Sequence, residues 1–78
     1  MSEWKEEDTL TKEFSFLTFV AAVEFVNKIT PLAEQMNHHP DVLVHSYNKV
    51  KITLSTHSEH KVTEKDWELV RKIDALFA

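Results

Sequence analysis

A histidine pair followed by proline, at residues 38–40, is the feature that most constrains how this chain can fold. Upstream of it, apolar residues recur every three or four positions from about Leu17 to Met36, which predicts an amphipathic helix. Pro40 disfavours helical geometry at the residue before it, and Asn37 readily takes the left-handed conformation that closes many helices. We therefore expect the helix to end near Asn37 and the chain to continue extended.

A second proline, Pro31, lies inside the same helical pattern. It removes one backbone N–H donor and clashes with the preceding turn, so we expect either a kink or a restart with Thr30 as N-cap. Four further apolar residues widen the main apolar stripe. These are Leu17, Val20, Phe25 and Leu32. A helix with so broad an apolar face usually packs against two partners, here its own sheet and a second subunit.

Alternation of apolar and polar residues predicts strands on both sides of this helix. Leu10 to Phe16 alternate with period two, and a weaker strand precedes them at Glu3 to Glu7. After the helix, Val42 to Tyr47 and Val50 to Thr56 are rich in β-branched residues and flank the turn residues Asn48–Lys49. This second pair of strands is therefore predicted to form a hairpin.

The last part of the chain predicts a second helix. Thr63 followed by Asp66 resembles a capping box, with Asp in place of the usual Glu. The expected buried face of the helix is Trp67, Val70, Ile73, Leu76 and Phe77. The element order is thus β-β-α-β-β-α over residues 1–78 as a single domain. We expect an α+β fold, a four-stranded antiparallel sheet with two helices packed on one face.

Composition excludes several classes of function. The 78 residues contain no glycine, which excludes glycine-rich phosphate loops, and no cysteine, which excludes disulfides and thiolate metal sites. A net charge of −4 without a basic cluster argues against direct binding of nucleic acid. The acidic N-terminus does not resemble a targeting peptide, and no apolar run is long enough to span a membrane. We expect a cytoplasmic protein that gains stability by oligomerising, because so short a chain buries a small core.

Three of the five histidines, His38, His39 and His57, fall at boundaries of predicted elements. Imidazole both donates and accepts protons near neutral pH, so two of these residues can serve as general acid and general base. The structural alternative is that the pair only ends a helix and His57 is a solvated strand residue; His45 and His60 are assigned to such roles. Zinc binding by three imidazoles is disfavoured, because adjacent histidines in extended chain point in opposite directions. We expect no metal.

An ordered set of residues and motifs is more specific than the histidines alone. Its members are, in chain order, Glu34, His38-His39-Pro40, Tyr47, His57 and Asp66. This arrangement resembles the signature of the pterin-4a-carbinolamine dehydratases over nearly the whole chain. Two departures stand out: members usually begin with another helix, whereas this chain starts almost at the first strand, and the loop after His57 lacks the family's glycines.

The resemblance implies an enzyme that removes water from 4a-hydroxytetrahydrobiopterin to give quinonoid dihydropterin, in tetrahydrobiopterin recycling, without a cofactor. His38 and His57 would be the acid–base pair, in an order that the residues leave open, and His39 would bind and orient the pterin. The positions that line the family's pterin site are Asn37, Pro40, Ser55, Thr56 and Ser58. Glu34 and Asp66 would either orient an imidazole or cap a helix; for Asp66 the cap is favoured, because its spacing from Thr63 already explains it.

The resemblance also implies partners. Members are homodimers or homotetramers, and some assist the dimerisation of a transcription factor or the assembly of the carbon-fixing carboxylase. The alternative function is therefore a non-catalytic dimerisation or assembly factor of the same fold. The intact histidine trio favours the enzyme, since a binding module has no need for it.

Overall fold

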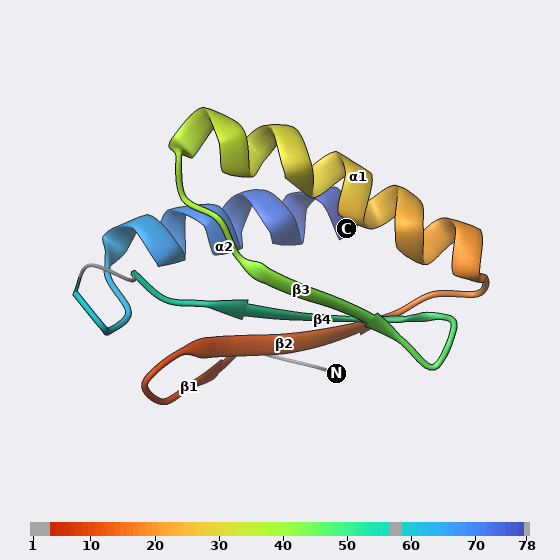
Figure 1. Ribbon diagram of the computed structural model, residues 1–78, viewed down its shortest axis with the longest axis horizontal. Coiled ribbons are helices and arrows are strands. Elements are labelled where there is room, and N and C mark those ends of the chain that lie inside the picture. The colour runs from red at the N-terminus through yellow and green to blue at the C-terminus, as the bar shows by residue number, and fades with distance from the viewer. Residues whose placement is uncertain (1–3, 57–58, 78) are drawn as a thin grey trace.

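The computed structural model describes residues 4–56 and 59–77, which form a four-stranded antiparallel sheet covered on one face by two helices (Figure 1). The elements, in chain order, are β1 (Lys5–Glu6), β2 (Leu10–Ser15), α1 (Phe19–Met36), β3 (Asp41–His45), β4 (Lys49–Leu54) and α2 (Glu64–Phe77). The strands lie in the order β1-β2-β4-β3, so pairing of β2 with β4 joins two hairpins into one sheet. The predicted α+β fold and element order are confirmed. Neither helix of this described part has the length and apolar character needed to cross a membrane.

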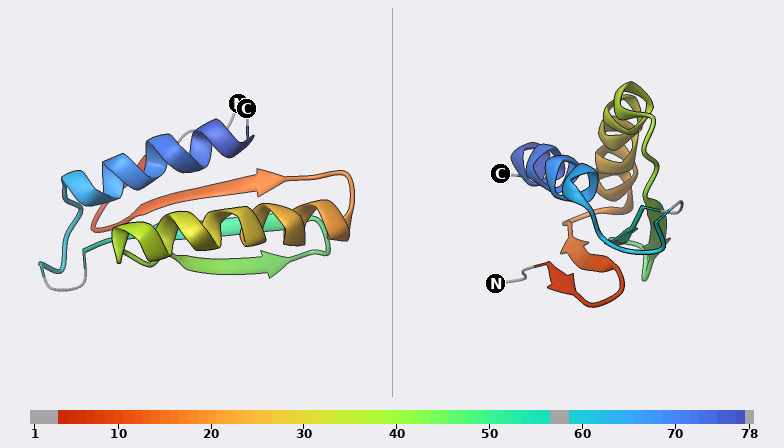
Figure 2. Two further views of the ribbon diagram at one scale, coloured as in Figure 1. Left: turned by 90° about the horizontal axis from the view of Figure 1, so that it is seen from above. Right: turned by 90° about the vertical axis from the view of Figure 1, so that its left-hand side faces the viewer.

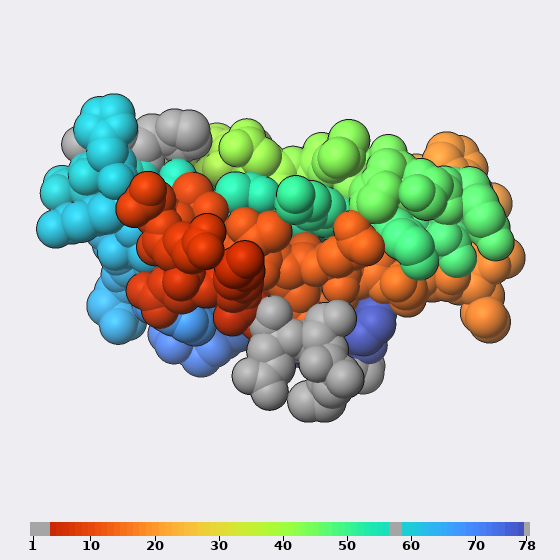
Figure 3. All heavy atoms as spheres, turned by 90° about the horizontal axis from the view of Figure 1, so that it is seen from below, coloured from red at the N-terminus to blue at the C-terminus, as the bar shows by residue number. Residues whose placement is uncertain are grey.

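The core lies between the two central strands and the helices. β2 and β4 pair over six positions, from Leu10 opposite Leu54 to Ser15 opposite Lys49. The buried apolar residues of these strands are Leu10, Phe14, Val50, Ile52 and Leu54, and those of the helices are Ala22, Phe25, Ile29, Ala33, Leu69, Val70 and Ile73. Figure 2 shows both helices on one side of the sheet, and Figure 3 shows the opposite face, on which the strands are not covered by a helix.

The start of α1 is set by Thr18, whose hydroxyl accepts a backbone N–H of the first turn. Leu17, predicted to belong to the helix, lies before this cap and is 94% exposed. The helix then runs without interruption through Pro31, which lies on its exposed side. Of the two alternatives predicted at Pro31, a kink or a restart, the restart with Thr30 as N-cap is wrong: the Thr30 hydroxyl donates at 3.1 Å to the carbonyl of Val26, one turn earlier in the same helix. Because Pro31 faces solvent, the carbonyl one turn before it can bond to water in place of the missing N–H, which lowers the cost of proline here.

The turn between β3 and β4 spans residues 46–48, so it begins two residues before the predicted turn residues Asn48–Lys49. Ser46 and Tyr47 have positive φ angles of 51° and 56°, a conformation that costs roughly 1–2 kcal/mol per residue when the side chain is not glycine. The expected turn residue Asn48 is the last residue of this turn, and its N–H donates to the carbonyl of Ser46 at 2.7 Å. Its side-chain amide donates 2.8 Å to the carbonyl of Phe16, and its own carbonyl accepts the N–H of Phe16 at 2.9 Å. This contact fixes the hairpin against the connection from β2 to α1. Both strands of the hairpin, β3 and β4, end two residues earlier than predicted, at His45 and Leu54.

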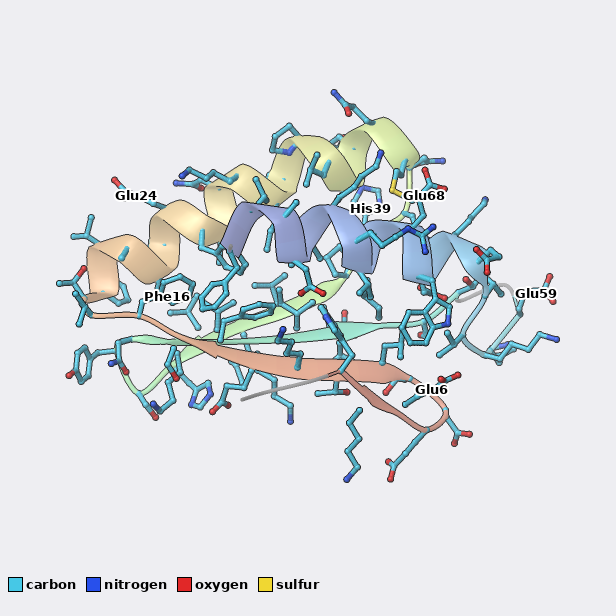
Figure 4. All side chains as sticks on the ribbon, turned by 180° about the vertical axis from the view of Figure 1, so that it is seen from behind. Glu6, Phe16, Glu24, His39, Glu59 and Glu68 are labelled. Carbon is cyan, nitrogen blue, oxygen red and sulfur yellow. The ribbon has the colours of Figure 1, made fainter. Side chains whose placement is uncertain are left out.

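α2 packs on the sheet through a face that differs slightly from the predicted one. Leu69 is fully buried and was missed, whereas Phe77 is 45% exposed. The ring of Phe77 nevertheless contacts an aromatic cluster under the N-terminal half of α1, in which Figure 4 labels Phe16. The other members of the cluster are Phe14 and Phe25. At the same helix, the carboxylate of Asp74 accepts the indole N–H of Trp4 at 3.0 Å, which anchors the chain before β1.

Candidate functional site

A polar cavity of about 340 Å³ opens at one end of the molecule. The last turn of α1, the chain after β4 and the first turn of α2 meet at this end, on the left of Figure 1. The described residues that line the cavity are Asn37, His38, His39, Pro40, Asp41, Thr56 and Lys65. Segments far apart in the sequence therefore supply one site.

The closure of α1 determines how the histidine pair is presented. Asn37 has the left-handed conformation, with φ 50° and ψ 43°, which confirms the predicted end of the helix. Its N–H donates to the carbonyl of Glu34 at 3.2 Å, and the N–H of His38 donates to that of Ala33 at 3.0 Å, the pattern of a Schellman motif. The backbone reverses there, so that the His38 side chain is 9% exposed and that of His39 is 57% exposed.

The buried imidazole is held by a buried carboxylate. Nε2 of His38 lies 2.5 Å from Oδ1 of Asp66, a residue of the first turn of α2 with no exposed surface. An ionised carboxylate only accepts hydrogen bonds, so Nε2 carries the hydrogen and donates it. Within the described residues Nδ1 has no hydrogen-bond partner. The pairing thus fixes the tautomer of His38 and leaves Nδ1 as the ring nitrogen available for chemistry.

The second oxygen of Asp66 is also fully used. Oδ2 accepts the backbone N–H of Thr63 at 2.8 Å and the hydroxyl of Thr56 at 2.9 Å. Because the single hydroxyl hydrogen of Thr56 goes to the carboxylate, the hydroxyl of Thr63 donates to Thr56 Oγ1, at 2.6 Å. The predicted capping of α2 by Asp66 is confirmed, and the same carboxylate holds His38. The two roles that the sequence offered as alternatives occur together.

These contacts keep Asp66 ionised. Burial by itself would raise the pKa of the Asp66 carboxyl, because desolvation disfavours the charged form. The hydrogen bonds from His38, from the Thr63 N–H and from Thr56 outweigh burial, so the pKa is lowered below its usual value. A buried negative charge therefore lies directly behind the imidazole at neutral pH.

His39 has a different partner and a different environment. Its Nε2 lies 2.6 Å from Oε2 of Glu34, within hydrogen-bond distance, and both side chains are more than half exposed. Figure 4 labels His39 just beyond the end of α1. Glu34 does not line the polar cavity but a smaller hollow of about 150 Å³ on the other side of His39 and Pro40. The remaining residues of that hollow are Val26, Ile29, Thr30, Ala33 and Val42.

The other predicted site residues are only partly brought to the cavity. Ser55 is half-buried after β4 and is not among the described lining residues, and His57 and Ser58 lie outside the residues that the structure describes. The sequence interpretation missed Asp41 and Lys65, whose sole signal is their position next to Pro40 and Asp66. In the described ranges, no three His, Asp or Glu side chains come together as metal ligands.

The fold and the cavity together define a small α+β protein with a histidine site between the ends of its helices and its sheet. The family model described as Pterin 4 alpha carbinolamine dehydratase matches residues 1–76, and the chain belongs to this family. A relative from Sulfolobus acidocaldarius, named "Putative pterin-4-alpha-carbinolamine dehydratase", is 54% identical over 71 residues, which cover 91% of this chain and 77% of the relative. A relative of the same name from Herpetosiphon aurantiacus is 47% identical over 78 residues, 99% of this chain and 80% of its own.

Two solved structures share the fold. A protein from Brucella melitensis described as a transcriptional coactivator/pterin dehydratase superposes with a TM-score of 0.87 at 37% identity, covering 94% of this chain and 80% of that one. A pterin dehydratase-like protein described as a RuBisCO assembly factor in the alpha-carboxysome superposes with a TM-score of 0.78 at 24% identity, covering 95% of this chain and 88% of that one. At that identity the second likeness concerns the fold alone.

Proposed function

We propose that this protein dehydrates 4a-hydroxytetrahydrobiopterin to quinonoid dihydropterin, by general acid–base catalysis and in tetrahydrobiopterin recycling. Membership of the dehydratase family supports the reaction class. The observation that carries the proposal is the buried His38, whose ring is tethered by Asp66 at the wall of a polar cavity. The cavity volume of about 340 Å³ falls in the range usual for small-molecule sites, about 300–1,000 Å³. The cytoplasmic location expected from the sequence belongs to the same proposal.

The reaction needs two proton transfers and no redox step. The bond from C4a to its hydroxyl breaks, a proton joins the departing hydroxyl to form water, and N5 loses its hydrogen to leave the quinonoid ring. A positioned imidazole can perform either transfer near neutral pH. We assign one transfer to His38 through Nδ1, and the other to His57 on the strength of the family resemblance.

Residues around the cavity would hold the substrate. His39 and Thr56 line it beside His38, and Asn37 presents a side-chain amide that can both donate to and accept from a pterin ring. Pro40, Ser55 and Ser58 complete the proposed binding set. Glu34 would act through His39, by holding its exposed ring at 2.6 Å.

The replacement His38→Gln tests the catalytic proposal. Glutamine can still donate an N–H toward Asp66, so the buried carboxylate keeps a partner, but it cannot transfer protons. We expect the dehydration rate to fall by about 10²-fold or more, because general acid–base catalysis typically supplies 10²–10⁴-fold. The measurement is the dehydration rate of a synthetic 4a-hydroxypterin, with far-ultraviolet circular dichroism to confirm folding.

His45→Gln is the matched control, since His45 pairs with Glu13 at 2.7 Å on the other face of the sheet and does not line the cavity. Its rate is expected to equal that of wild type. A His38→Gln variant as fast as wild type would refute the assignment. Failure of the wild-type protein to dehydrate any 4a-hydroxypterin would favour the alternative, a non-catalytic dimerisation or assembly factor.

We also propose that the protein is a homodimer or homotetramer. Apolar side chains in the first turn of α1 and just before it are unusually exposed: Leu17 by 94%, Val20 by 63% and Phe19 by 54%. Contiguous exposed apolar surface commonly marks an interaction site. Light scattering coupled to size exclusion should give a mass of two or four chains, and a mass of 9.1 kDa, that of one chain, would contradict the proposal.

A further inference from the structure

Asp41 and Lys65 are two charged residues of the polar cavity to which the proposed chemistry gives no role. Asp41 is the first residue of β3, directly after Pro40, and Lys65 lies in the first turn of α2, directly before Asp66. Both side chains are exposed. His38 and His39 each have a carboxylate partner, whereas neither Asp41 nor Lys65 makes a side-chain hydrogen bond or ion pair with any residue in the described ranges.

The charges of these two side chains suit a neutral ligand with separate donor and acceptor groups. One carboxylate and one ammonium leave the rim without net charge, so the cavity favours neither an anion nor a cation. A carboxylate presents two acceptor oxygens side by side, which match two parallel N–H donors. The pyrimidinone ring of a pterin offers such a pair, the 2-amino group and N3–H, next to the C4 carbonyl as an acceptor.

We propose that Asp41 determines specificity for the pterin ring, by accepting hydrogen bonds from its 2-amino group and N3–H, while Lys65 donates to the C4 carbonyl. This assignment rests on the proposed function. It would also bring the reacting atoms close to His38. C4a is bonded to C4, and N5 to C4a, so a carbonyl held by Lys65 directs both reacting atoms toward the neighbouring His38–Asp66 pair.

The experiment combines one substitution with one change in the ligand. Asp41→Asn replaces an acceptor oxygen by an N–H donor that opposes the donors of the pterin edge. We expect it to weaken binding of 7,8-dihydrobiopterin about tenfold or more, since hydrogen bonds to a charged group are stronger than those between neutral groups. KM should rise by a similar factor and kcat should change little, because Asp41 touches no reacting atom. The probe is titration calorimetry with 7,8-dihydrobiopterin and with its analogue lacking the 2-amino group.

The decisive readout is whether the affinity lost through Asp41→Asn and the affinity lost by removing the 2-amino group are additive. If Asp41 contacts the 2-amino group, wild type loses affinity for the analogue while Asp41→Asn loses much less, because the contact is already gone. Asp8→Asn, in the exposed turn between β1 and β2, is the control and should behave as wild type. Lys65→Met, tested with an analogue lacking the C4 oxygen, gives an independent second comparison of the same kind. Here too the variant should lose much less affinity for the analogue than wild type does.

Two failures can be distinguished. If wild type binds and dehydrates pterins, but Asp41→Asn discriminates against the analogue as strongly as wild type does, the role of Asp41 is refuted and the proposed function stands. If wild type neither binds 7,8-dihydrobiopterin nor dehydrates a 4a-hydroxypterin, both proposals fail together.

Discussion

Among the described residues, His38 and His39 are neighbours in the chain, and each pairs with a carboxylate at nearly the same distance in a different environment. His38 lies 2.5 Å from Asp66, and the next residue, His39, lies 2.6 Å from Glu34. The side chains of the first pair are 9% and 0% exposed, whereas those of the second are 57% and 68% exposed. Nearly equal distances therefore accompany opposite environments at adjacent positions of the chain.

The energetic difference between the pairs follows from solvent. Water competes for both partners of the exposed pair and screens their attraction, so such pairs contribute about 0–1 kcal/mol. In the buried pair, loss of one partner leaves a polar group without water or hydrogen bonds, which costs several kcal/mol. Burial rather than distance thus decides which carboxylate the fold depends on.

The largest expected difference is in stability, between Asp66→Ala and Glu34→Ala. Asp66→Ala removes the acceptor of His38, Thr56 and the Thr63 N–H, and should lower the free energy of unfolding by about 3–5 kcal/mol. Glu34→Ala should lower it by at most about 1 kcal/mol. Urea unfolding followed by tryptophan fluorescence measures both. Equal losses would show that burial does not separate the two pairs.

The next largest expected difference is in the dehydration rate of Asp66→Asn compared with that of Glu34→Gln. In Asp66→Asn the one remaining side-chain oxygen would have to accept from Thr56 and Thr63. The new NH₂ group would then face Nε2 of His38 and drive the imidazole hydrogen to Nδ1. We expect kcat to fall about tenfold to a hundredfold, part of the 10²–10⁴-fold that acid–base catalysis supplies, whereas KM should change little.

Glu34→Gln is the matched variant for this comparison of rates. It should retain kcat within about twofold, because the exposed pair lies outside the proposed proton path. Both rates are measured with the same synthetic 4a-hydroxypterin. Equal kcat values for the two variants would contradict a positioning role for Asp66.

The smallest effect is on the dependence of folding stability on pH. Because the pKa of Asp66 is lowered in the folded protein, its carboxylate stabilises the fold fully above the unfolded pKa of about 3.9. That contribution is lost as the pH falls through the folded pKa. Wild type should therefore lose its stability advantage over Asp66→Asn below about pH 4, measured as urea midpoints at several pH values. Parallel curves for the two proteins would contradict this linkage.

Much of the fold could be predicted from local patterns. The change from a helical to an alternating pattern around Asn37 and Pro40 located the end of α1, since both residues act through their own backbone. The turn between β3 and β4 begins earlier than predicted and ends at Asn48, which bonds to Phe16, 32 positions away; no local pattern records that contact. The restart at Thr30 was also predicted from local pattern alone. Tertiary packing of α1 on the sheet instead keeps the helix continuous across Pro31.

The site was less accessible to sequence reasoning. Spacing identified His38 and the capping role of Asp66, but not their contact across 28 positions, which depends on how α1 and α2 dock on the sheet. Asp41 and Lys65 gave no periodic or motif signal; only the shape of the cavity brings them together. The partners of a site residue come from tertiary packing, which a pattern read along the chain does not contain.

The hydrogen bonds that run from Thr63 through Thr56 and Asp66 to His38 have a consequence for how the protein opens. They join the beginning of α2, the end of β4 and the end of α1, and His38 is also bound through its N–H to Ala33. No one of these segments can detach without breaking bonds to the others. The His38 amide should therefore exchange its hydrogen with solvent only when the whole domain unfolds, so that the slowest-exchanging protons of the protein include one at its proposed reaction site.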